Sequence, residues 1–296
     1  MNKNRRILIT GGTGFIGKAL SNYLSIKGFD VTVISRQNNY VEDSRYLFIP
    51  NVKSIDDLEK VFIKNDFDSI VHLATFYCHA PLLHEVDKII EANLKFGTQV
   101  LELANKYNCK NFLNVTTGAE FRTGGSVQPN SLYATTKSLF RNLLSYYEFN
   151  HDFEVINFAL YDNYGANDER KKVIDLLITQ LNTSQFIDMS PGGQILYPIH
   201  IDDTLTAFEI ALTSFHEFSS QVSPNNVYCI APNNGISLKG LGCLIEKISG
   251  KTIAVNWGAL PYRQNENMKP WVGDRLPNWS EKISLESGIK LLIFGE

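Results

Sequence analysis

Tyr133 and Lys137 are the residues whose types and spacing first indicate chemistry. They lie four positions apart in a segment predicted to be helical from about Asn130-Ser131, so they share one helix face. An ammonium close to a phenol favours the phenolate, and we expect Lys137 to lower the pKa of Tyr133 from its ordinary value of about 10. Thr117 supplies a hydroxyl that could hold a carbonyl or alcohol oxygen against the phenol. The three side chains predict proton transfer coupled to hydride transfer, although exposed tyrosine–lysine pairs also arise by chance in helices.

A segment near the N-terminus is typical of a site for the dinucleotide that such a transfer requires. Residues 7–9 form a short apolar run, which predicts a buried parallel strand, and apolar residues at helical spacing follow it. The glycine-rich turn between them allows a tight bend, close approach of a pyrophosphate and packing of the helix on the strand. The first N–H groups and the dipole of the helix favour phosphate. An ordinary strand-to-helix turn is the alternative; we predict that the dinucleotide is bound by Gly11, Thr13, Gly14, Phe15, Ile16 and Gly17.

The end of the second predicted strand, residues 29–34, favours NADP(H) over NAD. A carboxylate at this place would accept hydrogen bonds from the ribose 2′-hydroxyl and repel a 2′-phosphate. Ser35 and Arg36 stand there instead, and a small hydroxyl with a guanidinium suits a phosphate dianion. A solvated arginine at the start of a loop is the alternative.

Later segments are predicted to reach the same edge of the sheet, where ligands of such folds bind. A strand over residues 69–74 leads into a loop whose Thr75, Tyr77 and His79 are candidates to line the pocket. A long helix is expected over residues 83–108, and the strand at residues 111–115 delivers Thr117. His72 is expected to pack and hydrogen-bond at its strand end rather than to catalyse.

Composition excludes several classes of protein. The chain has 296 residues, 44% of them apolar, a net charge of -3 and no basic field, so nucleic acid is an unexpected partner. No apolar run approaches the roughly 20 residues that span a bilayer, and the short run after Arg6 is broken too early for a signal peptide. The four cysteines lack metal or redox spacing, so we expect no metal site and buried free thiols in the cytoplasm.

Motifs along essentially the whole chain together resemble the extended short-chain dehydrogenase/reductase family, of the epimerase/dehydratase type that acts mostly on nucleotide-diphospho-sugars. The matching stretches are 11–17, 72–74, Asn93, Thr117, Tyr133 with Lys137, 162–165 and 199–203. The resemblance implies catalysis by Thr117, Tyr133 and Lys137, with Thr116 as the alternative threonine. It also implies cofactor contacts by Leu73, Ala74, Thr75, Asn93, Tyr133 and Lys137, and a substrate contact by Asn163.

Within this family, the chain most resembles the reductases that make CDP-abequose and CDP-paratose. The likeness lies in residues 72–79, 112–133 and 258–266. It implies NADPH-dependent reduction at C4 of a nucleotide-linked 4-keto-6-deoxyhexose, with CDP favoured, in deoxysugar and O-antigen-type polysaccharide biosynthesis. It also implies substrate contacts by Tyr77, His79 and Thr117, and a diphosphate contact by Arg263, whose guanidinium fork suits that task. A surface position is the alternative for Arg263.

Three departures from the family pattern qualify this expectation. Ala159 and Leu196-Tyr197 replace arginine-containing positions of many relatives, which leaves the nucleotide open. Gly118-Ala119 stand where sugar dehydratases of the family carry Asp-Glu, which argues against elimination.

The alternation of strands and helices predicts an α/β fold, a doubly wound parallel (Rossmann) sheet with a smaller C-terminal substrate-binding lobe. We expect residues 1–165 and about 200–224 in the NADP-binding domain, and about 166–199 and 225–296 in the lobe. By resemblance, a homodimer through helices at about 83–108 and 131–150 is expected. Two other functions stay open: an NAD-dependent nucleotide-sugar 4-epimerase, and a non-catalytic dinucleotide sensor that binds a protein.

Overall fold

A computed structural model describes residues 5–38, 45–78, 81–220 and 226–295, and all structural statements concern these residues. Its centre is a seven-stranded parallel sheet in the order β11-β6-β5-β4-β1-β2-β3. The strands are β1 (Arg6–Thr10), β2 (Asp30–Ile34), β3 (Leu47–Ile49), β4 (Ser69–His72), β5 (Asn111–Thr117), β6 (Glu154–Leu160) and β11 (Tyr228–Ile230). The strand order reverses between β1 and β4, as in doubly wound folds. The predicted fold class is confirmed.

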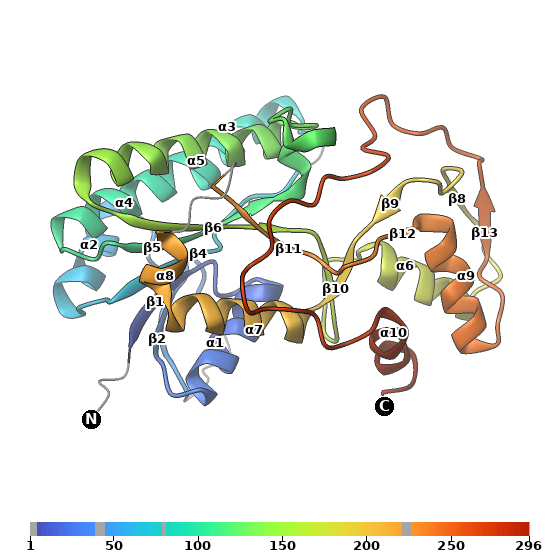
Figure 1. The fold of residues 1–296 in the computed structure, drawn as a ribbon, viewed down its shortest axis with the longest axis horizontal. Coiled ribbons are helices and arrows are strands. Elements are labelled where there is room, and N and C mark those ends of the chain that lie inside the picture. Colours follow the sequence, from blue (N-terminus) through green and yellow to red (C-terminus); the bar gives the residue numbers. More distant parts are fainter. Residues whose placement is uncertain (1–4, 39–44, 79–80, 221–225, 296) are drawn as a thin grey trace.

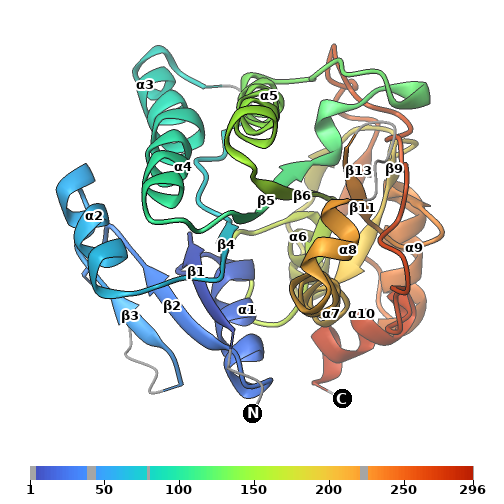
Figure 2. The same ribbon diagram turned by 60° about the vertical axis from the view of Figure 1, so that its left-hand side comes forward.

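Helices cover both faces of this sheet, as Figure 2 shows. Alternation along β1 explains the two layers: Ile7 and Ile9 pack with one helix layer, and Leu8 packs with the other. The first layer contains α1 (Phe15–Ile26), α7 (Ile201–Thr213) and α8 (Phe215–Ser219). The second contains α2 (Ile55–Lys64), α4 (Phe96–Lys106) and α5 (Leu132–His151).

The helix expected over residues 83–108 is not one regular helix. It consists of a 3-10 turn η1 (Leu83–Glu85), α3 (Val86–Ile90), a π-helical stretch η2 (Glu91–Lys95) and α4, and it ends at Lys106. The π-helical stretch contains Asn93, whose amide is fully engaged with the neighbouring loop and with α5. Such local widening of a helix recurs at functional sites.

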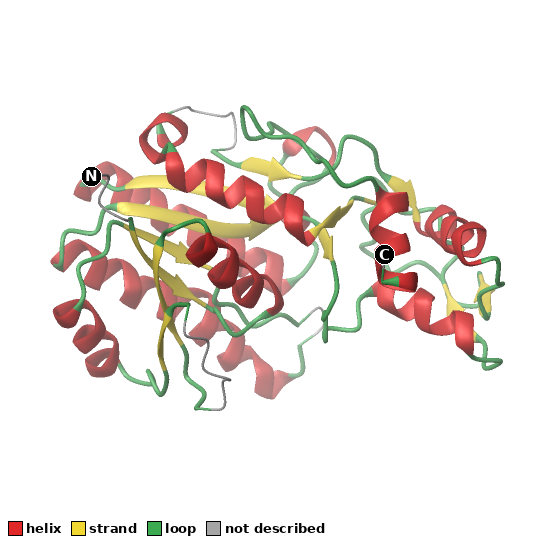
Figure 3. Ribbon diagram, turned by 90° about the horizontal axis from the view of Figure 1, so that it is seen from below, coloured by secondary structure: helices red, strands yellow, loops and turns green. Residues whose placement is uncertain are grey.

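A smaller lobe lies beside the sheet, on the right of Figure 1 and again on the right in Figure 3. Its own apolar core includes Leu177, Leu241 and Ile289. Its helices are α6 (Val173–Thr179), the 3-10 turn η5 (Gln180–Asn182), α9 (Leu238–Ser249) and α10 (Leu285–Phe294). Its short strands are β8 (Ile187–Met189) with β13 (Val255–Trp257), and β9 (Ile195–Leu196) with β12 (Ile236–Ser237). The pair β7 (Asp162–Tyr164) and β10 (Pro198–His200) joins the two parts.

Two C-terminal segments pack on the large sheet, although the sequence suggested that everything after residue 225 lies in the lobe. β11 pairs with β6 at the edge of the sheet. Its three residues are all buried, as suits a strand whose two faces are both covered. Trp279 is buried in the core under the sheet, and its indole Nε1 donates to the carbonyl of Asp203. β11 therefore belongs to the sheet and not to the lobe, and the remaining division into two domains stays a prediction.

The expectation of buried thiols holds for half of the cysteines. Cys109 and Cys229 are buried, Cys78 is partly buried and Cys243 is exposed, and none of the four forms a disulfide. Within the described ranges, no helix has the length and apolar character needed to cross a membrane.

Candidate active site

The glycine turn between β1 and α1 is shaped by close backbone contacts. Gly11 has a φ of +71°, and a Cβ there would lie 2.5 Å from the backbone N of Ala74. A Cβ at Gly17 would lie 2.3 Å from the carbonyl oxygen of Gly11. Gly14 is the N-cap of α1 and provides no side-chain cap, so no capping side chain occupies the first N–H groups of the helix. These features fit a dinucleotide pyrophosphate, which needs close backbone approach and N–H donors.

A cavity of about 660 Å³ begins at this turn and runs along the carboxyl ends of β1, β2 and β4. Its lining includes Gly11, Thr13, Gly14, Ser35, Arg36, Leu73, Ala74 and Thr75, which are all predicted cofactor residues. Phe15 and Ile16 lie on α1 next to it, and Gly17 is buried in the helix–strand contact. The cavity brings eight of the predicted residues together.

The end of the cavity next to β2 carries positive charge. Arg36 is exposed there, beside Ser35, whose hydroxyl accepts a hydrogen bond of 3.0 Å from the backbone N of Gln37. Lys53 also lines this cavity. Among the described residues that line it, the single carboxylate is Glu91, which pairs with Lys95 on its own helix. An anionic group such as a phosphate suits this end.

Asn93 links the loop after β4 to α5 by hydrogen bonds. Its Oδ1 accepts from the Thr75 hydroxyl at 2.9 Å and from the backbone N of Phe76 at 2.8 Å. Its Nδ2 donates to the Phe76 carbonyl and to the Thr136 hydroxyl. Because both amide atoms are engaged, Asn93 holds Thr75 at the cavity wall, and a direct contact of Asn93 with a cofactor stays a prediction.

Tyr133 and Lys137 both lie on α5, and Lys137 stands beside the end of β5. Ser131 caps α5 by accepting from the backbone N of Ala134, so Tyr133 lies in the first helical turn. The Lys137 ammonium donates to the Val115 carbonyl at 2.9 Å, which ties α5 to β5 two residues before Thr117. Thr117 is partly buried at the strand end, whereas Thr116 is buried and its hydroxyl has no partner within the described ranges.

The expected lowering of the Tyr133 pKa is wrong for this structure. Burial of the phenol raises the pKa of Tyr133 to about 12, and the Thr75 hydroxyl opposes this shift. Lys137 is itself buried, which lowers its pKa to about 8, and its ammonium is directed to the Val115 carbonyl. The desolvation of the phenol therefore outweighs the help that a lysine four residues away can give. Tyr133 is a neutral acid at pH 7.

The predicted substrate residues fall into three groups. Tyr77 is more than half exposed and its ring meets the Tyr133 ring edge-on, with centroids 4.9 Å apart. Asn163 is buried, and its Oδ1 accepts from Thr204 at 2.6 Å, so it holds β7 to α7. Arg263 is exposed on a loop, apart from the lining of the 660 Å³ cavity. His79 lies outside the described residues.

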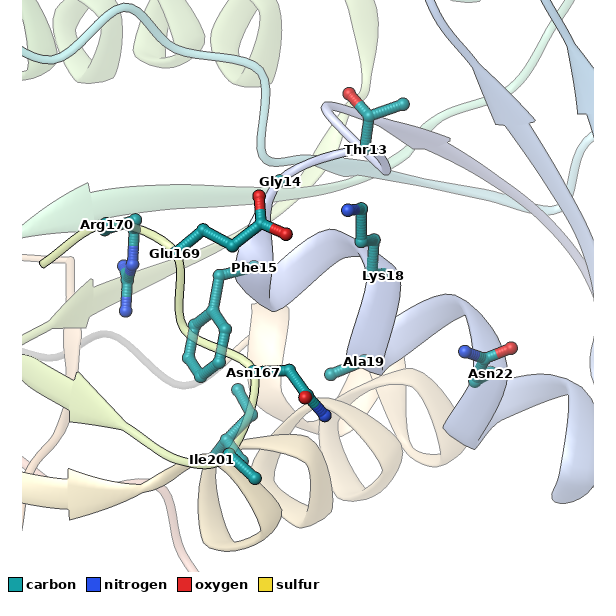
Figure 4. Close-up of a pocket in the computed structure, with 11 residues that line it drawn as sticks. Thr13, Gly14, Phe15, Lys18, Ala19, Asn22, Asn167, Glu169, Arg170 and Ile201 are labelled. Carbon is teal, nitrogen blue, oxygen red and sulfur yellow. The ribbon is translucent and has the colours of Figure 1, made fainter. Parts of the chain in front are cut away.

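A second cavity of about 430 Å³ shares Thr13 and Gly14 with the first and lies between α1 and the loop after β7 (Figure 4). The Arg170 guanidinium lies 4.4 Å from the centroid of the Phe15 ring and is held by both carboxylate oxygens of Asp168. Lys18 projects from the next turn of α1. The positive charge of Arg170 acts on Tyr133, so this loop reaches toward the residues predicted to be catalytic.

Within the described part of the chain, no group of three or more His, Cys, Asp or Glu side chains is placed to hold a metal ion. The polar groups that converge at the strand ends are hydroxyls, backbone N–H groups and cations. They can bind phosphate and transfer a proton.

Comparison with known proteins agrees with this geometry. Residues 7–230 match the model of the NAD dependent epimerase/dehydratase family. The chain belongs to this family. Similar family members include the CDP-abequose synthase of Yersinia pseudotuberculosis, 29% identical over 276 residues that cover 90% of this chain and 91% of that protein. The CDP-abequose synthase of Salmonella typhimurium is 28% identical over 298 residues, which cover 97% of both chains. The UDP-glucose 4-epimerase of Thermus thermophilus, solved with NAD, has the same fold, with a TM-score of 0.79 at 19% identity over 97% of both chains.

Several residues of this epimerase/dehydratase family member escaped the sequence-based prediction. Lys53 and Lys95 line the large cavity, and Arg170 and Lys172 approach from the loop after β7. The Lys172 ammonium lies 4.6 Å from the centroid of the Tyr77 ring. The basic run at residues 170–172, which follows the family-like stretch 162–165 after four residues, is the signal that could have indicated the last two. Lys53 and Lys95 carry no local signal, because only the fold brings them beside Arg36 and Thr75.

Proposed function

We propose that this protein uses NADPH to reduce the C4 keto group of a nucleotide-linked 4-keto-6-deoxyhexose. The observation that carries the proposal is the β2 end of the large cavity, where Ser35, Arg36 and Lys53 stand and where, among the described lining residues, no carboxylate accompanies them. A 2′-phosphate suits these cations, and NADPH is the usual donor for net reduction. The similarity to proteins named CDP-abequose synthase supports a CDP-linked deoxysugar.

The catalytic residues suit the reductive direction. NADPH, when bound, supplies the hydride. Tyr133, neutral at pH 7, donates its phenolic proton to the C4 oxygen as the ketone becomes an alcohol. The hydroxyl of Thr117 donates a hydrogen bond to the same oxygen and orients the ketone. Lys137 stabilises the phenolate that Tyr133 leaves behind, since a buried ammonium acts strongly in a low dielectric. A solvent proton then restores the phenol.

The segment after Thr117 argues against a dehydratase. The 3-10 turn η3 (Gly118–Glu120) begins with two residues that carry no acid or base, Gly118 and Ala119. The next carboxylate, Glu120, is completely buried and paired with Arg141. A carboxylate in that position cannot reach a sugar ring to assist elimination.

Substrate binding is proposed for the face that Tyr77 and Thr117 share with Tyr133. Tyr77 offers an exposed ring at the entrance, with the Lys172 ammonium over it, and this pair suits a sugar joined to an anionic diphosphate. Arg263 is proposed to bind the diphosphate from the C-terminal loop, and His79 to line the same pocket. Asn163 is proposed to act through the loop that it holds in place.

An NAD-dependent 4-epimerase is the second candidate. The solved UDP-glucose 4-epimerase of Thermus thermophilus carries NAD in the same fold. An epimerase takes a hydride and returns it, so it consumes no cofactor. Its first step needs Tyr133 as a base, which the high pKa of this phenol disfavours.

A homodimer is proposed through α3 and α5, which contact each other in the same layer (Figure 2). Apolar side chains are exposed on both segments, namely Leu83 in η1 with Ile90 at the end of α3, and Leu139 with Tyr146 on α5. Seven residues make two α-helical turns, so Leu139 and Tyr146 point the same way. A second copy of this surface would cover the exposed stripe.

The deciding experiment follows NADPH absorbance with purified protein and 4-keto-6-deoxyhexoses linked to CDP, dTDP, GDP or UDP. We expect stoichiometric oxidation of NADPH with the CDP series and formation of the 4-hydroxy sugar. Interconversion of sugar isomers by protein that carries bound NAD, without net cofactor use, would replace the reductase by the epimerase. Specific capture of NADPH with no turnover of any sugar would favour the non-catalytic sensor.

A further inference from the structure

Glu120 has no role in the chemistry proposed above, yet it is fully buried close to the catalytic residues. Its side chain is 0% exposed, and Oε2 accepts a hydrogen bond of 2.8 Å from Nε of Arg141. Oε1 is buried as well and lacks a hydrogen-bond partner in the part of the chain that is described. Burial of a carboxylate with one oxygen unsatisfied is costly and calls for an explanation.

Helix α5 brings the catalytic lysine to the same region. Tyr133, Lys137 and Arg141 follow one another at four-residue spacing, so they share one face of the helix. Lys137 is 3% exposed, and its ammonium donates to a neutral carbonyl, that of Val115. A buried ammonium stays charged only when an anion acts on it through the low-dielectric interior. Glu120 is the one carboxylate, among the described residues, whose charge favours the protonated form of Lys137.

The other titratable groups around this cluster cannot replace Glu120. His72 approaches Lys137 from β4, and burial lowers the pKa of His72 to about 3, so the ring is neutral. Tyr133 is also neutral, because its pKa is raised to about 12. Arg141 is a cation that stabilises the charge of Glu120 from α5. Burial raises the pKa of Glu120 to about 7, so this carboxyl becomes charged as the pH rises through neutrality, toward the range in which Lys137 would otherwise lose its proton.

We propose that Glu120, held in place by Arg141, is a positioning residue that keeps Lys137 protonated and thereby sets the alkaline limit of activity. The effect on activity rests on the proposed reductase function. The charge of Lys137 does not, because it can be measured without cofactor or substrate. If Glu120 only fastened η3 to α5, its replacement would change stability and leave the titration of Lys137 in place.

The test compares Glu120→Gln with the unmodified protein. In protein labelled with ¹³C-lysine, the Lys137 side-chain resonance is identified by its absence in Lys137→Arg and is followed from pH 6 to 10. We expect its midpoint to fall by about one pH unit or more when the carboxylate is removed. The alkaline limb of kcat/KM should move with it, so that activity at pH 8 falls about fivefold while activity at pH 6 stays close to that of the unmodified protein.

Two further variants keep the test decisive. Arg141→Lys retains a cation beside Glu120 and should retain the original midpoint. The double variant Glu120→Leu/Arg141→Met replaces the ion pair by apolar side chains, which preserves folding if Glu120→Gln alone unfolds, and it should show the same lowered midpoint. A Lys137 titration that superposes on that of the unmodified protein in both carboxylate-free proteins overturns the inference. If the protein reduces none of the sugars, the Lys137 titration still tests the role of Glu120. The reductase proposal and the Glu120 proposal can therefore fail independently.

Discussion

The acidity of Tyr133 is decided by its surroundings rather than by its sequence neighbours. A lysine at i+4 suggests an activated phenolate, but burial desolvates the phenol, the nearby Tyr77 adds to this effect, and the pKa of Tyr133 rises to about 12. The same burial keeps the phenol of Tyr133 protonated at neutral pH, so that it can act as a proton donor. Desolvation depends on groups from β4, α5 and the loop after β7, which sequence spacing does not reveal.

Tyr133→Phe should abolish turnover and leave NADPH binding nearly intact. The substitution removes the proton donor and keeps the ring that packs against Tyr77, so we expect a loss of about a hundredfold or more in kcat. Turnover is measured by NADPH absorbance and binding by NADPH fluorescence. Tyr107→Phe, which removes a phenol at the end of α4 away from the cavity, is the matched control. Normal turnover by Tyr133→Phe would remove Tyr133 from the mechanism.

Arg36→Ala should weaken NADPH binding about tenfold or more and change NADH binding little. A guanidinium that binds a 2′-phosphate contributes about 1.5–3 kcal/mol, and NADH lacks that phosphate. Dissociation constants for both cofactors give the answer by fluorescence titration. Lys290→Ala removes an equal charge on α10 and serves as the control. Equal losses for NADPH and NADH would contradict the choice of NADPH.

At the scale of elements, most helices and strands could be predicted because short-range patterns determine them. The apolar run before Gly11 and the Ser131 cap before Tyr133 are such patterns, and β1 and α5 lie where they indicate. The π-helical stretch at Asn93 could not be predicted, because it depends on hydrogen bonds to Phe76 and Thr136, which are distant in sequence. The pairing of β11 with β6 depends on the tertiary fold in the same way.

His72 makes strand β4 sensitive to acid. The ring is buried among Phe96, Phe112 and Phe140 and shares a hydrogen bond with Thr10, and burial lowers its pKa to about 3. The unfolded chain binds a proton to this residue below about pH 6.5 and the folded protein does not, so stability falls as the pH drops from 6.5 toward 3.

Between pH 7 and pH 5, His72 should account for about 2 kcal/mol of lost unfolding free energy. His72→Gln cannot take up this proton, so its urea unfolding should show a pH dependence that is smaller by this amount. The comparison uses the change between the two pH values, which cancels the constant cost of the substitution. An identical pH dependence in both proteins would show that the His72 ring is protonated in the folded state.

At the scale of the whole molecule, the exposed stripe on α3 and α5 predicts a dimer. Leu139→Glu places a charge in the centre of this stripe and should convert the dimer to a monomer, because a carboxylate is costly to bury between apolar surfaces. Sedimentation velocity gives the mass in solution. Ile63→Glu, at an exposed apolar position on α2, should leave the dimer intact. A monomeric unmodified protein, or a dimeric Leu139→Glu variant, would refute this interface.

The return of the chain to the large sheet after residue 225 has a consequence for how the protein folds during its own synthesis. β11, residues 228–230, is the edge strand of this sheet next to β6, and Trp279 fills part of the core that the sheet covers. A nascent chain that has emerged only to residue 165 therefore exposes the unpaired edge of β6 and an incomplete apolar face. Because domains fold as units during synthesis, this core can close only after Trp279 has emerged from the ribosome. The large sheet is thus completed only after the intervening segments of the lobe have been translated, and a version truncated at residue 165 should require a chaperone or aggregate.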